Sequence, residues 1–342
     1  MRAVFGPGAS ATVRERLAEL SIERPLLVGT PAAPQRHAAL LASLADLPLT
    51  TFFGAAPHCP VAVVERCRAL YRSRRCDGVV AIGGGSTLGL GKILAAEEGA
   101  KFLALPTTYS GSEMTPLFGR KIGNEKRVGR DPRCRPQVVI YDSQLTADLP
   151  VRVAVTSGMN SVAHAVEALY PQRPNPLAPL LAEQALASHA YGLRAIARGA
   201  PSADALNAAL YGGCLGGMLV SMCGIALHHQ LCHVLGGLFD LPHGETNAVV
   251  LPHAVAYNLP AIGAARAVIE RVFGGTNAAV ALYEFVGDIG APRSLRELGM
   301  PESGVEPAVS AMLAHGGWNP RPLERAGILK LLRAAFAGEP PS

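Results

Sequence analysis

The stretch Asp77-Gly-Val-Val-Ala-Ile-Gly-Gly-Gly-Ser-Thr87 decides the fold class of the N-terminal half. A short apolar run is followed directly by three glycines and then by a helical pattern that continues to Glu98. A buried strand that ends in glycines and opens a helix begins a β–α unit, and the free N–H groups of such a helix start can bind a phosphate. Because Leu88 stands where the G-x-G-x-x-G fingerprint needs glycine, a plain strand-to-helix turn is the alternative.

Similar units surround this stretch. Strands alternating with helices predict a parallel sheet with helices on both faces, and such sheets bind ligands at the carboxyl ends of their strands. After Leu149-Pro150 the patterns are almost entirely helical. We therefore expect an α/β dinucleotide-binding domain at 1–150 and an all-helical substrate and catalytic domain at 151–342. The further strands are expected at 24–29, 101–105 and 137–141, and helices at 60–74, 158–170, 178–198 and 203–235.

The composition excludes several classes of protein. Of 342 residues, 49% are hydrophobic and 17% charged, which excludes intrinsic disorder. The net charge of +5 comes from scattered Lys and Arg residues, so we expect no nucleic acid as partner, whereas a small anionic ligand fits. The seven cysteines form no CxxC motif, and the N-terminus lacks an apolar signal sequence, so we expect reduced thiols and a cytoplasmic location.

One uncharged segment imitates a membrane span. Residues 205–239 contain no Asp, Glu, Lys or Arg, and Gly212-x-x-x-Gly216 lies within them. The segment stands alone, is rich in glycine and continues into several histidines. A fully buried helix has the same composition, so we expect a core helix and no membrane partner.

A second polar turn follows the expected strand at 101–105. Its hydroxyl groups can donate hydrogen bonds to a phosphate or a ribose, although an ordinary Ser/Thr loop is the alternative. Two such turns after successive strands favour a nucleotide. No acid follows the strand at 24–29 to bind a ribose hydroxyl or repel a 2′-phosphate, so NADPH is expected to be accepted as well as NADH. The predicted cofactor-binding residues are Gly83, Gly84, Gly85, Ser86, Thr107, Thr108, Ser110 and Ser112.

The second half carries a polar cluster. Asn160 and His164 are spaced i, i+4, as are His229 and His233, and His243 follows in Pro-His-Gly. This spacing places two side chains on one helix face, as metal-binding helices do. One histidine alone would be an ordinary core or surface residue, but several around an uncharged helix favour a site.

These motifs together resemble the iron-containing (group III) alcohol dehydrogenase superfamily, and within it the maleylacetate reductases. The resemblance implies a Rossmann-like sheet followed by an all-α domain, as in dehydroquinate synthase, and a homodimer. It also implies NAD(P)H-dependent reduction of the maleylacetate C=C bond to 3-oxoadipate in aromatic degradation. The alternatives are a related, metal-dependent enzyme acting on another carbonyl or enone, a lyase of the dehydroquinate synthase type, or a nucleotide-binding protein without catalysis. The landmarks are residues 83–86, 106–115, 129–132, 139–142, 156–170, 227–236, 242–246 and 319–322.

The resemblance also suggests roles for the polar cluster. Metal-dependent members hold Fe²⁺ or Zn²⁺ with one Asp and three His, and the matching positions here are Asn160, His164, His229 and His243. Because Asn160 removes the anionic ligand, we expect weak or no metal binding, although three histidines alone can hold zinc. A histidine would then stabilise and protonate the enolate. His243, held by its turn, is favoured over His229 and His233.

A dianionic substrate needs cationic or amide partners. Asn160, Lys121 and Arg321 are the candidates, and Lys126 matches a lysine that lies near the cofactor in this superfamily. An ion-paired surface arginine is an equally good interpretation of Arg321, as a solvated loop lysine is of Lys126.

Overall fold

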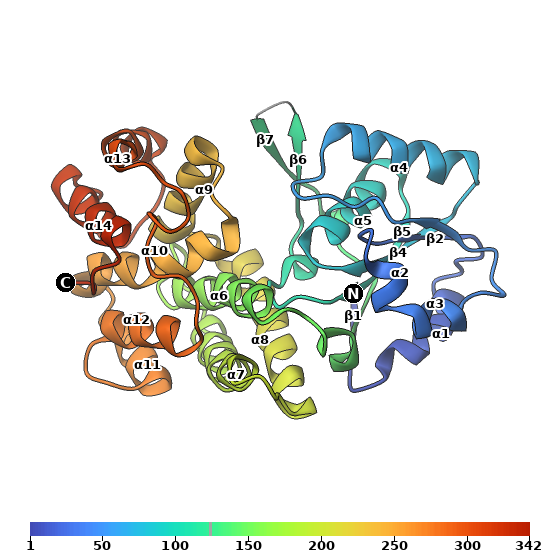
Figure 1. Cartoon of the computed structure of the whole chain (residues 1–342), viewed down its shortest axis with the longest axis horizontal. Coiled ribbons are helices and arrows are strands. Elements are labelled where there is room, and N and C mark those ends of the chain that lie inside the picture. Colours follow the sequence, from blue (N-terminus) through green and yellow to red (C-terminus); the bar gives the residue numbers. More distant parts are fainter. Residues whose placement is uncertain (123–124) are drawn as a thin grey trace. The chain divides into compact units, whose positions relative to one another are not determined.

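The computed structural model describes residues 1–122 and 125–342, with the backbone alone for residues 122, 125 and 126. The chain divides into two compact units, Met1–Leu149 and Pro150–Ser342. Six strands of the first unit form one sheet in the order β1-β8-β5-β4-β2-β3, and every neighbouring pair is parallel (Figure 1). The expected class, an α/β region followed by a helical region, is confirmed. The sheet strands are β1 Arg2–Phe5, β2 Pro25–Val28, β3 Thr50–Phe52, β4 Gly78–Gly83, β5 Lys101–Pro106 and β8 Val138–Tyr141.

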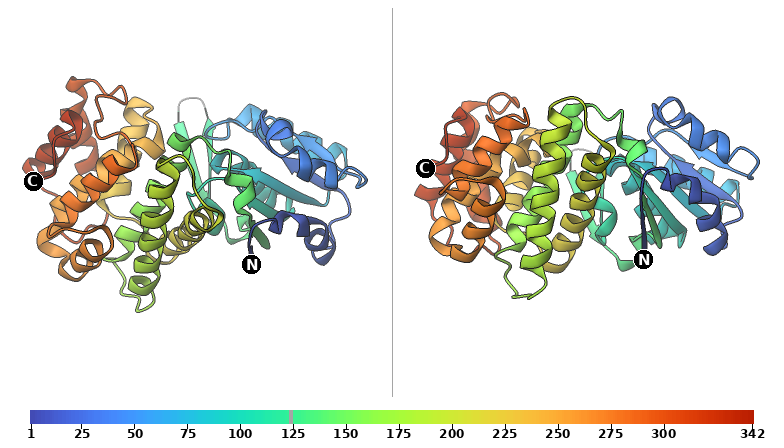
Figure 2. Two further views of the ribbon diagram at one scale, coloured as in Figure 1. Left: turned by 60° about the horizontal axis from the view of Figure 1, so that its bottom comes forward. Right: turned by 90° about the horizontal axis from the view of Figure 1, so that it is seen from below.

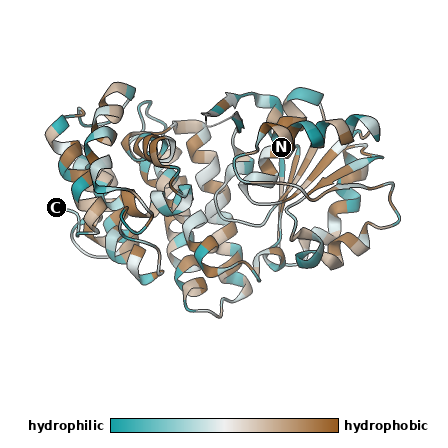
Figure 3. Cartoon of the chain, turned by 45° about the horizontal axis from the view of Figure 1, so that its top comes forward, coloured by the Kyte–Doolittle hydropathy of each residue, from teal (hydrophilic) through white to brown (hydrophobic). Residues whose placement is uncertain are grey.

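Helices cover both faces of this sheet, as successive side chains of β4 show. Val80 and Ile82 pack into one apolar cluster with Val13 and Leu40 from the helices α1 and α3. Ala81 points the other way, toward α5, where a Cβ on Gly91 would lie 3.2 Å from it. Both faces are buried at the central strands β2, β4, β5 and β8, which are therefore mostly apolar, as their brown colour in Figure 3 shows. The outer strands β1 and β3 are partly exposed. The helices of this unit are α1 Val13–Glu19, α2 Ala33–Arg36, α3 Ala38–Ser43, α4 Val61–Ser73 and α5 Gly85–Glu98.

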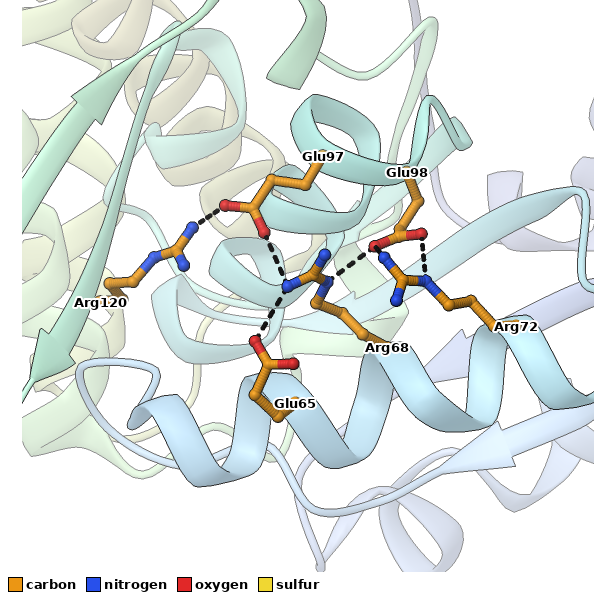
Figure 4. A network of polar contacts seen from close by, with 6 residues as sticks. All are labelled: Glu65, Arg68, Arg72, Glu97, Glu98 and Arg120. Carbon is orange, nitrogen blue, oxygen red and sulfur yellow. Dashed lines mark hydrogen bonds and ion pairs between the residues drawn. The ribbon is translucent and has the colours of Figure 1, made fainter.

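A network of ion pairs fastens α4, α5 and the antiparallel hairpin of β6 (Leu117–Ile122) and β7 (Glu125–Arg130) (Figure 4). Arg68 and Arg72 of α4 both donate to the carboxylate of Glu98, at 2.7 and 2.8 Å. Arg120 of β6 pairs with Glu97 of α5. The hydrogen bonds from Arg72 and Arg68 lower the pKa of Glu98, because they favour its charged form. The hairpin is thus tied to the helix that follows the glycine turn.

The second unit is a set of helices (Figure 2). Its core gathers apolar side chains of α9, α10, α13 and α14, including Leu231, Val250, Val309 and Leu332. The helices are α6 Val151–Ala168, α7 Ala178–Ala197, α8 Ala203–Cys223, α9 Leu227–Phe239, α10 His243–Asn258, α11 Gly263–Phe273, α12 Ala278–Asp288, α13 Val305–His315 and α14 Arg325–Ala337.

The uncharged segment forms two helices, so the predicted single helix at 203–235 is wrong. Gly224 has a φ of 78°, which ends α8, and α9 begins three residues later. Within the described residues α8 alone is long and apolar enough to cross a membrane, and 61% of its most apolar stretch is buried. Its glycines serve helix packing: a Cβ on Gly212 would lie 2.8 Å from the His189 ring, and one on Gly216 would overlap the Ser161 hydroxyl.

Candidate active site

A small cleft lies at the carboxyl ends of β2, β4 and β5 in the first unit. Its volume is about 160 Å³, and it opens where a parallel sheet of this kind binds its ligand. The turn after β2, the glycine turn, the threonine loop and the segment after β8 all contribute to it. The lining residues are Thr30, Arg36, His37, Ile82, Gly83, Gly84, Thr107, Thr108, Gln144, Leu145, Asp148 and Leu149.

The three glycines of the turn after β4 differ in how closely other atoms approach them. Gly83 has a φ of 150°, and a Cβ there would lie 2.5 Å from the Thr87 hydroxyl. A Cβ on Gly84 would lie 2.7 Å from Cγ2 of Thr108, so this glycine lets the turn touch the threonine loop. Gly85 is exposed, and a Cβ there would meet nothing within 4 Å. Packing therefore explains Gly83 and Gly84, while the space beside Gly85 is open at the start of α5.

The structure brings together four of the nine predicted cofactor residues. Gly83, Gly84, Thr107 and Thr108 line the cleft, and the Thr107 backbone N–H donates to the carbonyl of Gly83 at 3.1 Å. The others lie outside the residues that line it: Gly85, Ser86, Ser110 and Ser112. The side chain of Lys126 lies outside the described residues.

Lys92 holds the loop that follows β5, and sequence reasoning missed it. Its side chain is buried, and Nζ donates to Oγ1 of Thr115 and to the carbonyl of Leu117, both at 2.8 Å, and also to the carbonyl of Ser112. Burial lowers the pKa of Lys92 to about 8. The available signal was its isolation, because it is the single charged residue of 78–96. A charge in an apolar run is retained only with partners.

The histidines of the second unit lie close together. His164 on α6 stacks on His229 of α9 with ring centroids 4.5 Å apart. His228 meets His229 edge to face at 4.6 Å, and His233 stacks on His243, the first residue of α10, at 5.9 Å. Three helices thus bring together the histidines that the sequence singled out, with Asn160 one turn before His164 on α6.

Glu167 orients this cluster from one side. Its Oε2 lies 2.7 Å from Nδ1 of His229, and its Oε1 accepts the backbone N–H of His228 at 2.9 Å. Because the carboxylate binds Nδ1 of His229, the other ring nitrogen, Nε2, is left for the site. Within the described part of the chain, Nε2 of His229 and Nδ1 of His164 are buried and have no hydrogen-bond partner. An acid that fixes a ring in this way is typical of histidines that bind metal or substrate.

The histidines of the cluster differ in burial. Burial holds the pKa of His164 and of His229 well below the ordinary value, and the neighbouring imidazoles add to this shift. Both rings are therefore neutral at pH 7, and His229, whose Nδ1 donates to the Glu167 carboxylate, presents the lone pair of its Nε2 to the site. His243 is only half-buried and His233 is exposed, so water can reach both of these rings.

Glu167, His228 and His229 also offer ligand atoms within 4.8 Å of one another. These atoms already serve other contacts, since Glu167 binds both histidines and Nε2 of His228 lies 3.1 Å from the carbonyl of Asn247. Glu167 and His228 thus form a hydrogen-bonded support for His229.

The two remaining predicted substrate residues have contacts of their own. Arg321 donates to the carbonyl of Tyr257 at 2.8 Å and lies over the Tyr257 ring at 4.4 Å. Tyr257 is near the end of α10 and His243 begins that helix, so about 21 Å of helix separates them at 1.5 Å per residue. Arg321 therefore stabilises the far end of α10. Lys121 belongs to β6 of the first unit, where its backbone N–H donates to Cys59.

Comparison with known proteins covers both units. A family model described as iron-containing alcohol dehydrogenase matches residues 1–143, and one described as Fe-containing alcohol dehydrogenase family, C-terminal, matches 154–336. The chain is 42% identical over 344 residues to a maleylacetate reductase of Pseudomonas aeruginosa, covering 100% of this chain and 97% of that one. It is 41% identical over 340 residues to a maleylacetate reductase of Sphingobium indicum, covering 99% and 96%.

A solved structure gives the same result. The crystal structure of maleylacetate reductase from Rhizobium sp. strain MTP-10005 superposes with a TM-score of 0.94 at 41% identity, covering 99% of this chain and 97% of that one. The similarity therefore extends over both units and is not limited to the glycine turn and the threonine loop.

Proposed function

This chain belongs to the iron-containing alcohol dehydrogenase family, and we propose that it is a reductase that converts maleylacetate to 3-oxoadipate with a reduced nicotinamide cofactor. The observation that carries this proposal is the full-length match, at 41–42% identity, to enzymes named for this reaction. The neutral, buried histidine pair and its acid support are consistent with it.

The chemistry requires a hydride and then a proton. Maleylacetate is an enone flanked by two carboxylates, and a bound reduced nicotinamide would supply hydride to the carbon β to the ketone. The electron pair of the C=C bond moves toward the ketone oxygen, giving an enolate. A proton on the α-carbon then completes 3-oxoadipate, so each turnover consumes one reduced nicotinamide and one proton.

His243 is the proton donor that we propose for this step. His164 and His229 are neutral and buried, which makes them poor acids and good hydrogen-bonding partners for the substrate. His243 is half-buried at the start of α10 and stacks on the exposed His233, which can exchange protons with water. Asn160, one helical turn before His164, is the amide partner that we assign to the substrate.

The polar cluster of the second unit offers donor atoms that suit a divalent cation, but it offers no negative charge. Three imidazoles of the type that binds zinc are present, and two of their buried nitrogens lack a partner among the described residues, but Asn160 supplies an amide instead of a carboxylate. Asn160, His164, His229 and His243 would hold such an ion, which would polarise the substrate ketone. We propose that binding is weak, because no donor in this set is anionic.

The cleft at the end of the sheet is the cofactor site in this proposal. Gly83 and Gly84 bring the backbone close to a dinucleotide, and Thr107 and Thr108 donate hydroxyl hydrogen bonds. We further propose that the enzyme is cytoplasmic, acts as a homodimer and serves aromatic degradation, as the family resemblance implies. The alternative is reduction of the ketone or of another carbonyl by the same fold, because family members share architecture while substrates differ.

Steady-state oxidation of NADH and NADPH with fresh maleylacetate, with and without EDTA, tests the proposal. We expect rapid turnover that EDTA leaves unchanged. Turnover that EDTA abolishes and Zn²⁺ or Fe²⁺ restores would contradict weak metal binding. Absence of turnover with bound cofactor would contradict the choice of substrate.

A further inference from the structure

The side of the cleft next to β2 has a different chemistry from the rest. Thr30, Arg36 and His37 line it there, all from the segment that follows β2. This segment, residues 29–37, contains no Asp or Glu. In dinucleotide-binding sheets an acid at this place binds the ribose 2′-hydroxyl, whereas an arginine nearby accommodates a 2′-phosphate.

Close packing fixes this segment against the sheet. A Cβ on Gly29 would lie 2.7 Å from Cβ of Ala33 and 3.1 Å from the Phe53 ring, so α2 starts as near to the end of β2 as glycine permits. The Ala33 N–H donates to the carbonyl of Thr30 at 2.9 Å, and the His37 N–H to that of Ala33 at 2.9 Å. Arg36 and His37 are thus placed at the cleft by backbone geometry.

The two side chains are available for a ligand. Arg36 is exposed, and no carboxylate among the described residues pairs with it, unlike Arg14 of the same unit, which pairs with Asp46. His37 is only 9% exposed, yet its Nδ1 has no hydrogen-bond partner within the described part of the chain. A buried ring nitrogen without a partner, beside an unpaired guanidinium, is a site that lacks an anion.

We propose that Arg36, with His37 behind it, binds the 2′-phosphate of NADPH and makes this chain prefer NADPH to NADH. A dianionic phosphate would receive charge-assisted hydrogen bonds from the guanidinium and one from the imidazole, none of which NADH can replace. The inference rests on the proposed function only in that it assumes a nicotinamide dinucleotide in this cleft.

The cleft also contains one carboxylate, Asp148, which comes with Gln144 and Leu145 from the segment after β8. Asp148 could accept from a ribose hydroxyl and favour NADH. The absence of any acid in the segment after β2, where Arg36 lies, argues that the arginine decides the preference. The test therefore also includes Asp148→Asn, because Asp148 could set the cofactor preference instead of Arg36.

The test measures binding without catalysis, so that it does not depend on the substrate. Calorimetry compares adenosine 2′,5′-bisphosphate with 5′-AMP on the whole protein and on Arg36→Gln, Arg36→Lys, Asp148→Asn and the control Arg74→Gln. Arg74 is exposed at the end of α4, is not among the cleft residues, and its replacement removes the same charge. Thermal unfolding of each variant checks that the fold is intact.

We expect the native protein to bind the bisphosphate about tenfold or more tightly than 5′-AMP. Arg36→Gln should remove this difference, Arg36→Lys should restore part of it, and Arg74→Gln should leave it unchanged. Equal loss of both ligands in Arg36→Gln would place the arginine on the shared part of the dinucleotide and overturn the proposal. An unchanged ratio in Arg36→Gln, or a ratio set by Asp148→Asn, would also overturn it.

Kinetics on the intact enzyme separate this inference from the proposed function. With maleylacetate as substrate, Arg36→Gln should raise KM for NADPH much more than KM for NADH. If maleylacetate is not reduced but the bisphosphate binds as expected, the substrate assignment fails and the 2′-phosphate site stands.

Discussion

Oε2 of Glu167 lies 2.7 Å from Nδ1 of His229, and both side chains are buried. Glu167 also accepts the backbone N–H of His228, so a single carboxylate fixes two consecutive residues of α9. Because the ring of His229 is fixed through Nδ1, its Nε2 is directed to the remaining cluster. Glu167 is thus a positioning residue that acts through His229.

Replacing Glu167 tests this relationship. Glu167→Gln keeps the size of the side chain but removes the charge, so we expect kcat to fall about 10–100-fold while KM for the cofactor stays the same. The matched control is Glu183→Gln on α7, which breaks an exposed pair with Arg271 and should leave kcat unchanged. An unchanged kcat in Glu167→Gln, with cofactor binding intact, would show that the orientation of His229 does not matter for turnover.

The two glycines at the start of α5 should respond differently to alanine. Gly84→Ala drives a Cβ into Thr108, so we expect a lower melting temperature together with weaker cofactor binding. Gly85→Ala meets no atom within 4 Å, so the melting temperature should not fall. If the dinucleotide phosphate uses the open space beside Gly85, the same change raises KM for the cofactor several-fold. Normal cofactor KM in Gly85→Ala would place the phosphate elsewhere.

Acid should destabilise the fold through its buried histidines. Burial lowers the pKa of His189 to about 3, so below pH 6.5 the unfolded chain takes up a proton that the folded chain refuses. The neutral His189 does not lower the free energy of unfolding above pH 6.5. As the pH is lowered from there, the free energy of unfolding decreases, by about 2 kcal/mol at pH 5. Urea unfolding at pH 7 and pH 5 should therefore show a smaller loss in His189→Leu than in the native protein. The exposed His315→Leu serves as the control, and equal losses in all three proteins would refute the prediction.

The buried Lys92 should make the protein more stable as the pH rises. Its pKa is about 8 in the folded protein against 10.5 ordinarily, so between these values the unfolded chain binds more protons than the folded one. The contribution of Lys92 to the free energy of unfolding therefore rises with pH, by about 2 kcal/mol between pH 8 and pH 10. Comparing the native protein with Lys92→Met across this range isolates the effect, and the exposed Lys330→Met is the control. If the difference in free energy of unfolding between the native protein and Lys92→Met does not change with pH, the pKa of Lys92 is not lowered in the folded protein.

The sequence patterns predicted the parallel sheet because apolar runs and glycine turns are local features. They predicted the histidine cluster because i, i+4 spacing is also local. They gave a wrong length for the helix at 203–235, since one glycine with a positive φ ends α8 inside an apolar run. The helix ends because of a backbone torsion angle, which the hydrophobicity pattern does not reveal.

The missed residues depend on contacts between distant parts of the chain. Glu167 meets His229 across 62 positions, and Lys92 meets Leu117 across 25, so neither role shows in local spacing. Arg321 shows the reverse, since its motif suggested substrate binding and its contacts are with Tyr257. In each case the sequence shows a charged residue within an apolar stretch or a motif, which indicates that it has a partner. Only the fold identifies that partner.

The most direct test of C=C reduction by this enzyme follows the hydride. Maleylacetate is reduced with nicotinamide cofactor deuterated at the transferred position, and the product is analysed by NMR and mass spectrometry. We expect 3-oxoadipate with one deuterium on the carbon β to the ketone. Deuterium on a carbinol carbon would show that the enzyme reduces the ketone instead of the C=C bond, and would contradict the proposed function.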